Sequence, residues 1–193
     1  MIGADVLVAV EHALCAHFGQ RPSRASVCFL GVEPIEVLRF EPIPGEGAAY
    51  VSLGMSRHPM TAASQQVVGA DGPRAELVLH AGKGSGRCDD VWRQLAVLAA
   101  APSVEGVVYV AGMTVDLGQP VAPGSRCTGG VLAESVLAAI ETPQGPVTLL
   151  QVLPATPSEL AWCRVHDTPA LRERWSAQHI DLFDLARRAA TLE

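Results

Sequence analysis

Cys88 has the most reactive side chain in a position that could support chemistry. It precedes a predicted helix that contains Trp92, and a helix N-terminus lowers the pKa of a thiol and favours the nucleophilic thiolate. Nucleophilic catalysis also needs a histidine base, for which His58, His80 and His166 are the candidates. No local signature places any of them beside Cys88. A Cys/His-dependent enzyme is therefore an alternative, and a small buried thiol is the simpler interpretation.

The glycines of HAGKGSGR follow a predicted strand and precede a predicted helix, as phosphate-binding loops do. Gly82, Gly84 and Gly86 do not match G-x-G-x-x-G. Lys83 precedes the turn rather than following it, as it would in G-x-x-x-x-G-K-[ST]. We therefore interpret Gly82 to Arg87 as a solvent-exposed turn, and a small-molecule sensor that binds there is a second alternative.

Metal-binding residues have unsuitable spacings. His12 and His17 are five residues apart, which places them on different faces of a helix. Asp181 and Asp184 lie at a predicted helix start, where acidic residues suit the helix dipole. The sequence therefore predicts no metal, no cofactor and no catalytic residues.

The segment from Pro146 to Leu160, PVTLLQVLPATPSEL, predicts a buried strand followed directly by a helix. Its near-continuous apolar run is typical of a strand covered on both faces, and Pro154 is expected to end it. Thr156, Pro157 and Glu159 match the N-cap, N1 and N3 positions of a helix. The threonine hydroxyl and the glutamate carboxylate would each cap a free backbone N–H.

Helices are expected early, centrally and late around a block of strands. This order favours an α+β fold, with a mixed β-sheet flanked by helices, over alternating βαβ units. The expected strands are Val27 to Val32, Ile35 to Phe40, Tyr50 to Gly54, Glu76 to His80 and Val107 to Ala111. The expected helices are Ile2 to Phe18, Asp89 or Asp90 to Pro102, Pro157 to Val165, Pro169 to Ala177 with Thr168 as its cap, and Asp181 to Ala190.

Composition restricts the class of protein. A chain of 193 residues with 49% hydrophobic and 18% charged residues fits one folded domain, residues 1–193. The net charge of -6 argues against a nucleic-acid interface and leaves basic protein partners open.

The sequence also predicts a cellular location. Four prolines interrupt the longest uncharged run, Thr142 to Ser158, so we expect no membrane-spanning helix. Asp5 and Glu11 interrupt the N-terminal apolar residues, which argues against a secretory signal. Five widely spaced cysteines without a C-x-x-C pair indicate reduced thiols. We therefore expect a cytoplasmic protein.

Four segments together resemble the suppressor of fused (SUFU) domain family. They are YVSLGMS at Tyr50 to Ser56, AELVLH at Ala75 to His80, VWRQLAVLA at Val91 to Ala99, and PVTLLQVLPATPSEL. Their order and approximate spacing match the family as well, so the resemblance extends from about Ile35 to Arg188. It implies a fold like that of the SUFU N-terminal domain.

The resemblance also implies a function. The animal member has no known enzymatic activity and holds a peptide of a transcription factor as an added strand between two domains. This chain resembles only the N-terminal domain of that protein. Many bacterial single-domain relatives are thought to be immunity proteins that neutralise toxins.

The resemblance points to one set of partner-binding residues. In the animal protein, the peptide-contacting strip includes a Gly-acid-His turn, which Gly112, Met113 and Thr114 match here only at the glycine. Met113 replaces the acidic residue. We therefore predict a non-enzymatic protein-binding module, either a toxin-neutralising immunity protein or a regulatory binder. Its expected partner is another protein, with a toxin encoded nearby as the leading candidate, and its oligomeric state is left open.

Overall fold

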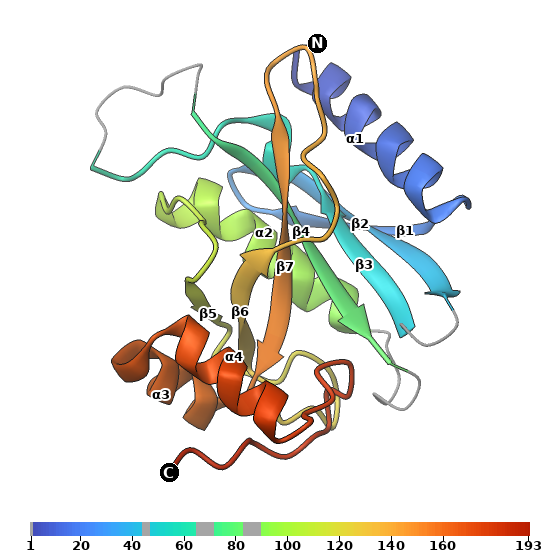
Figure 1. Cartoon of the computed structure of the whole chain (residues 1–193). Coiled ribbons are helices and arrows are strands. Elements are labelled where there is room, and N and C mark those ends of the chain that lie inside the picture. Colours follow the sequence, from blue (N-terminus) through green and yellow to red (C-terminus); the bar gives the residue numbers. More distant parts are fainter. Residues whose placement is uncertain (1, 44–46, 65–71, 83–89) are drawn as a thin grey trace.

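The structure is a computed structural model that describes residues 2–43, 47–64, 72–82 and 90–193 (Figure 1). The strands are β1 (Ser23–Phe29), β2 (Val32–Ile43), β3 (Gly47–Leu53), β4 (Arg74–Ala81), β5 (Thr114–Asp116), β6 (Gly129–Glu134) and β7 (Val147–Ala155). The helices are α1 (Ile2–Phe18), α2 (Val91–Glu105), α3 (Pro157–His166), α4 (Thr168–Ala177) and the short 3-10 helix η1 (Met55–Arg57).

The strands form one mixed sheet in the order β1-β2-β3-β4-β7-β6-β5. The β4–β7 pair is parallel, and the other strand pairs of the described residues are antiparallel. The predicted α+β fold with a mixed sheet flanked by helices is therefore confirmed. Within the described part of the chain, no helix has the length and apolar character needed to cross a membrane.

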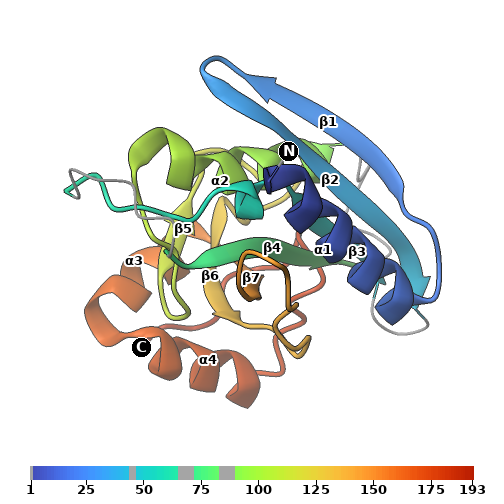
Figure 2. The same cartoon turned by 90° about the horizontal axis from the view of Figure 1, so that it is seen from above.

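Helices cover both faces of the sheet (Figure 2). On one face, α2 packs Leu95 in a cluster with Val37 of β2 and Leu77 of β4. On the other face, α1 packs Val10 in a cluster with Leu38 of β2, while α3 and α4 pack against β6 and β7. Neighbouring residues of β2 thus point to opposite faces, as the two-residue period of a strand requires.

The first hairpin turns at Leu30–Gly31, whereas the sequence predicts a break at Pro34. Phe29 closes the hairpin by pairing with Val32, and Pro34 lies inside β2. The register of the two strands shifts between Val27 and Phe29, opposite this proline. Such an irregularity accommodates a residue without an N–H group, so the strand continues.

The central helix also continues past a proline that the sequence predicts as its end. α2 runs through Pro102 to Glu105, and Asp90 precedes it without a capping hydrogen bond from its side chain. Gly106 then adopts a left-handed conformation (φ +65°), and its N–H donates to the carbonyl oxygen of Pro102 (3.1 Å). Pro102 is buried, and its missing N–H removes one hydrogen bond from the last turns of the helix.

Two further boundaries differ from the prediction. The apolar run Val107 to Ala111 forms no strand, and the end strand of the sheet begins later, at Thr114. β7 passes through Pro154 to Ala155. Its pairing with β4 ends at Gln151, so Pro154 needs no N–H on that side of the strand.

The predicted helix from Asp181 to Ala190 is wrong, because the structure has turns and extended chain there. The carboxylate of Asp181 accepts a hydrogen bond from the Phe183 N–H (2.9 Å), and that of Asp184 accepts one from the Ala186 N–H (2.9 Å). These turns, which acidic side chains form readily, replace the helical hydrogen bonds.

Candidate functional site

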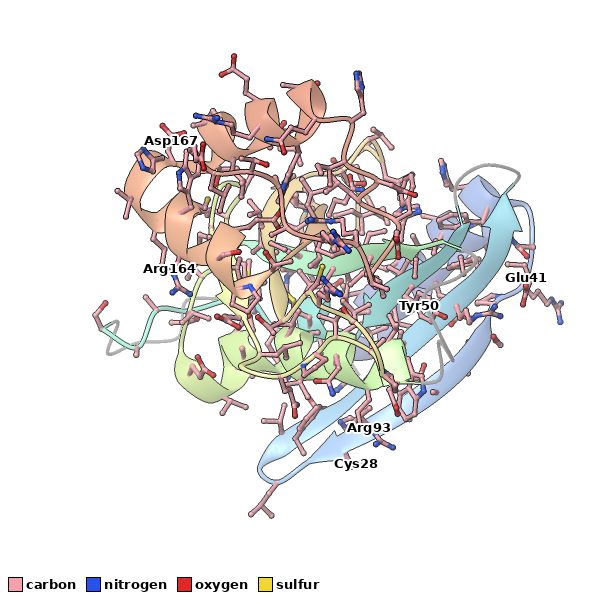
Figure 3. All side chains as sticks on the ribbon, turned by 90° about the horizontal axis from the view of Figure 1, so that it is seen from below. Cys28, Glu41, Tyr50, Arg93, Arg164 and Asp167 are labelled. Atoms are coloured by element: carbon pink, nitrogen blue, oxygen red, sulfur yellow. The ribbon has the colours of Figure 1, made fainter. Side chains whose placement is uncertain are left out.

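An open groove of about 470 Å³ lies between the start of β5 and the junction of α3 with α4. On the sheet side it is lined by Gly112, Met113 and Thr114, which are the three residues predicted from the resemblance. On the helix side it is lined by Cys163, Arg164, Asp167, Thr168 and Pro169. Figure 3 shows Arg164 and Asp167 on the side of the molecule formed by the orange helices. We call these eight residues the groove.

The sheet side of the groove is the turn that leads into β5 and lies against β6. Gly112 has a φ of +94°, which favours glycine, and its N–H donates to the Leu132 carbonyl (2.7 Å). The Leu132 N–H in turn donates to the Met113 carbonyl (2.8 Å). Further along, a Cβ atom on Gly129 would lie 2.0 Å from the Val115 carbonyl oxygen, so only glycine permits this close approach of β5 to β6.

The helix side of the groove is a sharp junction between two helices. Asp167 caps α4 by accepting a hydrogen bond from the Ala170 N–H (2.9 Å), whereas the sequence predicts Thr168 as the cap. The Thr168 hydroxyl instead donates to the Gly112 carbonyl (2.7 Å) and lies 3.4 Å from the Cys163 Sγ. Thr168 therefore connects the two sides of the groove.

The groove carries both charges and apolar atoms. An Arg164 Nη2 atom lies 3.6 Å from Asp116 Oδ2, and both side chains are partly exposed, so this ion pair contributes less than about 1 kcal/mol. Asp116 thus holds the Arg164 guanidinium only weakly. Cys163 is buried, and its neighbour Thr168 is a hydroxyl rather than a base. Thr168 is therefore not a general base that could activate the Cys163 thiol.

A buried cluster around Glu159 holds α3, α4 and the C-terminal segment together. The Glu159 side chain is fully buried, and one of its oxygens accepts hydrogen bonds from Arg187 Nη1 (2.8 Å), Trp175 Nε1 (2.9 Å) and the Ala190 N–H (2.9 Å). The other accepts from Arg187 Nη2 (2.9 Å), the Thr156 N–H (2.8 Å) and the Thr156 hydroxyl (3.0 Å). These five residues are the Glu159 cluster.

The cluster confirms the capping box predicted at Thr156 and Glu159 and adds a buried ion pair to it. Burial alone would raise the pKa of Glu159, but the hydrogen bonds from Arg187 and from the Thr156 and Ala190 N–H groups hold that pKa below its usual range. Glu159 is therefore a charged structural residue. Its cluster fixes the helices that form one side of the groove.

A second buried carboxylate organises the turn after β3. Glu76 accepts hydrogen bonds from the Ser52 hydroxyl (2.5 Å), the Gly54 N–H (2.9 Å), and the N–H (2.9 Å) and hydroxyl (2.6 Å) of Ser56. These four residues are the Glu76 cluster. They belong to YVSLGMS and AELVLH, so the cluster connects two of the segments that carry the family resemblance.

The alternative sites lie elsewhere or outside the described residues. Cys88 and residues 83–89 of the glycine-rich turn are not among the residues that the structure describes. His58 hydrogen-bonds to Glu33 on the surface (2.6 Å), and His166 stacks on Trp162, with ring centres 4.2 Å apart. Across the described ranges, no three histidine, cysteine, aspartate or glutamate side chains are grouped so that they could hold a metal ion.

The three residues predicted to bind a partner line one side of the groove, and no residue of the other side was predicted to bind one. Asp167, Thr168 and Pro169 repeat the cap-then-proline pattern of Thr156 and Pro157 directly after the preceding helix. This repetition signals a tight helix junction. It does not reveal that the junction faces Gly112, which is 56 residues away from Thr168.

Several solved structures resemble this fold, including three suppressor of fused structures. One is the Sufu–Fu complex (15% identity, TM-score 0.66), for which the match covers 97% of this chain and 90% of that chain. Another is a suppressor of fused homologue from Neisseria gonorrhoeae FA 1090 (17% identity, TM-score 0.68), for which the match covers 96% of this chain and 97% of that chain. The third is Drosophila Suppressor of Fused (14% identity, TM-score 0.70), with 95% of this chain and 50% of that chain covered.

At these identities, the likeness to solved structures shows the fold alone. No curated protein sequence matches the chain. The model of the family described as Suppressor of fused protein (SUFU) matches residues 31–188. This match includes all four segments in which the resemblance was recognised. The chain belongs to the suppressor of fused protein family.

Proposed function

We propose that this chain is a non-enzymatic protein-binding module that holds a segment of its partner in the groove, beside β5. The observation that carries the proposal is the position of Gly112, Met113 and Thr114. They line a groove at the open end of the sheet, where β5 has β6 as its strand neighbour in the described chain. One of the similar structures is a complex of Sufu with Fu, which supports a binding function for the fold.

The geometry favours an extended segment as the ligand. An end strand exposes backbone N–H and C=O groups that can pair with an added strand, and neighbouring side chains then select among segments. Met113 and Pro169 offer apolar contacts, whereas Arg164 and Asp167 offer a positive and a negative charge. The expected ligand is therefore an extended peptide with at least one acidic side chain placed to meet Arg164.

We further propose that the partner is a toxin and that this chain is its immunity protein. The net charge of -6 suits a basic partner, which would associate rapidly through electrostatic attraction. The proposal treats residues 1–193 as one domain that acts in the cytoplasm. The four cysteines described, Cys15, Cys28, Cys127 and Cys163, are free thiols, as a reducing compartment requires.

Site-specific crosslinking tests the binding function. A photoreactive amino acid replaces Arg164 in the groove, or Arg172, which is exposed on α4 outside the groove. In the native cell, we expect the Arg164 derivative to crosslink to one protein in stoichiometric amounts and the Arg172 derivative to give no such product. Equal crosslinking from both positions, or from neither, would remove the basis of the proposal.

Co-expression tests the immunity role. The captured protein should stop growth when it is expressed alone, and the wild-type chain should restore growth. The Arg164→Glu variant should protect poorly, and Arg172→Glu should protect fully. If the captured protein is harmless, the immunity role is rejected and the chain is a regulatory binder instead.

A further inference from the structure

Among the described strands, the sheet has a second open edge at β1, on the opposite side from the groove (Figures 1 and 2). Exposed edge strands invite pairing with other strands, and they are usually protected by proline, lysine or short length. β1 has seven residues, SRASVCF, without proline or lysine and with Arg24 as its one charged side chain. Cys28 lies on this strand at the periphery of the molecule (Figure 3).

The charge on β1 is already balanced within the chain. Arg24 forms ion pairs with Glu11 of α1 and with Glu36 of β2, the latter at 2.9 Å. At the register shift of the first hairpin, the extra residue belongs to β2, which advances three residues while β1 advances two. The side chains of β1 therefore keep the regular alternation of a strand. The edge is therefore regular and electrostatically neutral.

An exposed leucine and a groove with a partly apolar lining flank this edge. Leu30, at the tip of the hairpin, is fully exposed. A second open groove of about 430 Å³ lies between α1 and β1, and Val8, which is 67% exposed, is one of its lining residues. Cys15 and Pro22 also line this groove, together with Glu11, His12, Arg21 and Arg24, and we call it the α1–β1 groove.

We propose that two copies of this chain pair through β1, antiparallel and around a two-fold axis at Ser26. Ser26 is the middle residue of β1, so this register pairs the strand over its full length. It places Arg24 opposite Cys28 of the second copy, and Ala25 opposite Val27, so no like charges meet. A register centred on Arg24 would oppose two arginines, which is unfavourable.

The same register brings Leu30 and the α1–β1 groove together. Continuing the pairing beyond β1 places Leu30 of each copy opposite Pro22 of the other, at the α1–β1 groove. Two exposed leucines would thereby lose their contact with water. The result is an isologous dimer with one continuous sheet, which leaves both β5 edges open.

Sedimentation measures this dimer directly. We expect the wild-type chain to dimerise with a Kd of about 1 to 100 µM, as for a small interface. Ser26→Lys places two lysines opposite each other on the two-fold axis and should raise the Kd at least about 100-fold. Ser103→Lys, on the exposed surface of α2, is the matched control and should not change the Kd.

Disulfide trapping tests the register without relying on Ser26→Lys. Arg24→Cys should form intermolecular disulfides with Cys28, giving a covalent dimer on oxidation. Adding Cys28→Ser should abolish that dimer. A wild-type chain that remains monomeric at several hundred µM would overturn the proposal, as would a dimer that Ser26→Lys leaves intact or an Arg24→Cys variant that forms no disulfide.

Discussion

Replacing Glu159 with glutamine should be among the most destabilising single changes in this protein. The substitution keeps the shape of the side chain but removes its charge, and it presents an amide NH₂ to donors that need an acceptor. The carboxylate accepts two hydrogen bonds from Arg187, two from Thr156 and one each from Trp175 and Ala190. Arg187, which is also buried, is left without its counter-charge.

Loss of one member of a buried ion pair costs about 3 to 5 kcal/mol. For a domain of this size, that corresponds to a decrease in Tm of about 10 °C. The assay is urea unfolding at pH 7 followed by tryptophan fluorescence. Glu173→Gln, on the exposed surface of α4, is the matched control and should change the free energy of unfolding by less than about 0.5 kcal/mol.

A double-mutant cycle of Glu159 and Arg187 separates the contribution of their ion pair to stability from the contribution of side-chain packing. The double variant Glu159→Gln with Arg187→Met removes both charges, so its destabilisation should be smaller than the sum of the two single effects by about 2 kcal/mol or more. Additive effects would show that the pair is not coupled. A Glu159→Gln variant that lost less than about 1 kcal/mol would refute the assigned role of the cluster.

The pH dependence has a definite sign. Because the pKa of Glu159 is lower in the folded state than its usual value, the charged form stabilises the protein above the unfolded pKa of about 4.3. This contribution is lost as the pH falls through the folded value. Between pH 7 and pH 3, the wild-type protein should therefore lose more stability than Glu159→Gln does.

Four other predictions concern the Glu76 cluster, the groove and the thiols. Glu76→Gln should destabilise the fold by about 3 kcal/mol in urea unfolding, because buried donors lose their acceptor. Gly112→Ala should cost about 1 to 2 kcal/mol through backbone strain alone, since its Cβ would meet no atom within 4 Å; a negligible loss would contradict the strain argument. Thr168→Val should lower the free energy of unfolding by about 1 kcal/mol, because it removes the hydrogen bond to the Gly112 carbonyl, whereas Thr168→Ser should retain that hydrogen bond. Burial raises the pKa of Cys127 to about 11, so a thiol reagent at pH 8 should label exposed Cys28 much faster, and equal rates would contradict this burial.

Local sequence patterns predicted the elements that local contacts determine. The capping box at Thr156 and Glu159 joins residues three positions apart, so the sequence contains all the information it needs. The helix from Ile2 to Phe18 likewise follows from the spacing of its apolar residues, and Gly19 ends it with a φ of +63°. Both predictions are confirmed.

The prediction failed where tertiary contacts override local preferences. Pro154 does not end β7, because the pairing of β7 with β4 has already ended at Gln151. The Asp181 to Ala190 segment has helix-compatible spacing, but Arg187 and the Ala190 N–H bind to Glu159, far away in the chain. A single sequence contains no local signal for such contacts.

The groove was predicted only in part for the same reason. Gly112, Met113 and Thr114 were found through resemblance rather than through their own chemistry. The helix side depends on the contact of Thr168 with Gly112, which joins residues 56 positions apart. Only the folded chain brings these two segments together.

The affinity of the crosslinked partner for variants of this chain shows whether that partner binds at the groove. Calorimetric titration of that partner, purified, would compare the wild-type chain with Arg164→Glu in the groove and Arg172→Glu outside it. We expect Arg164→Glu to raise the Kd at least about 10-fold and Arg172→Glu to change it less than about twofold. Equal affinities for all three chains would contradict binding at the groove.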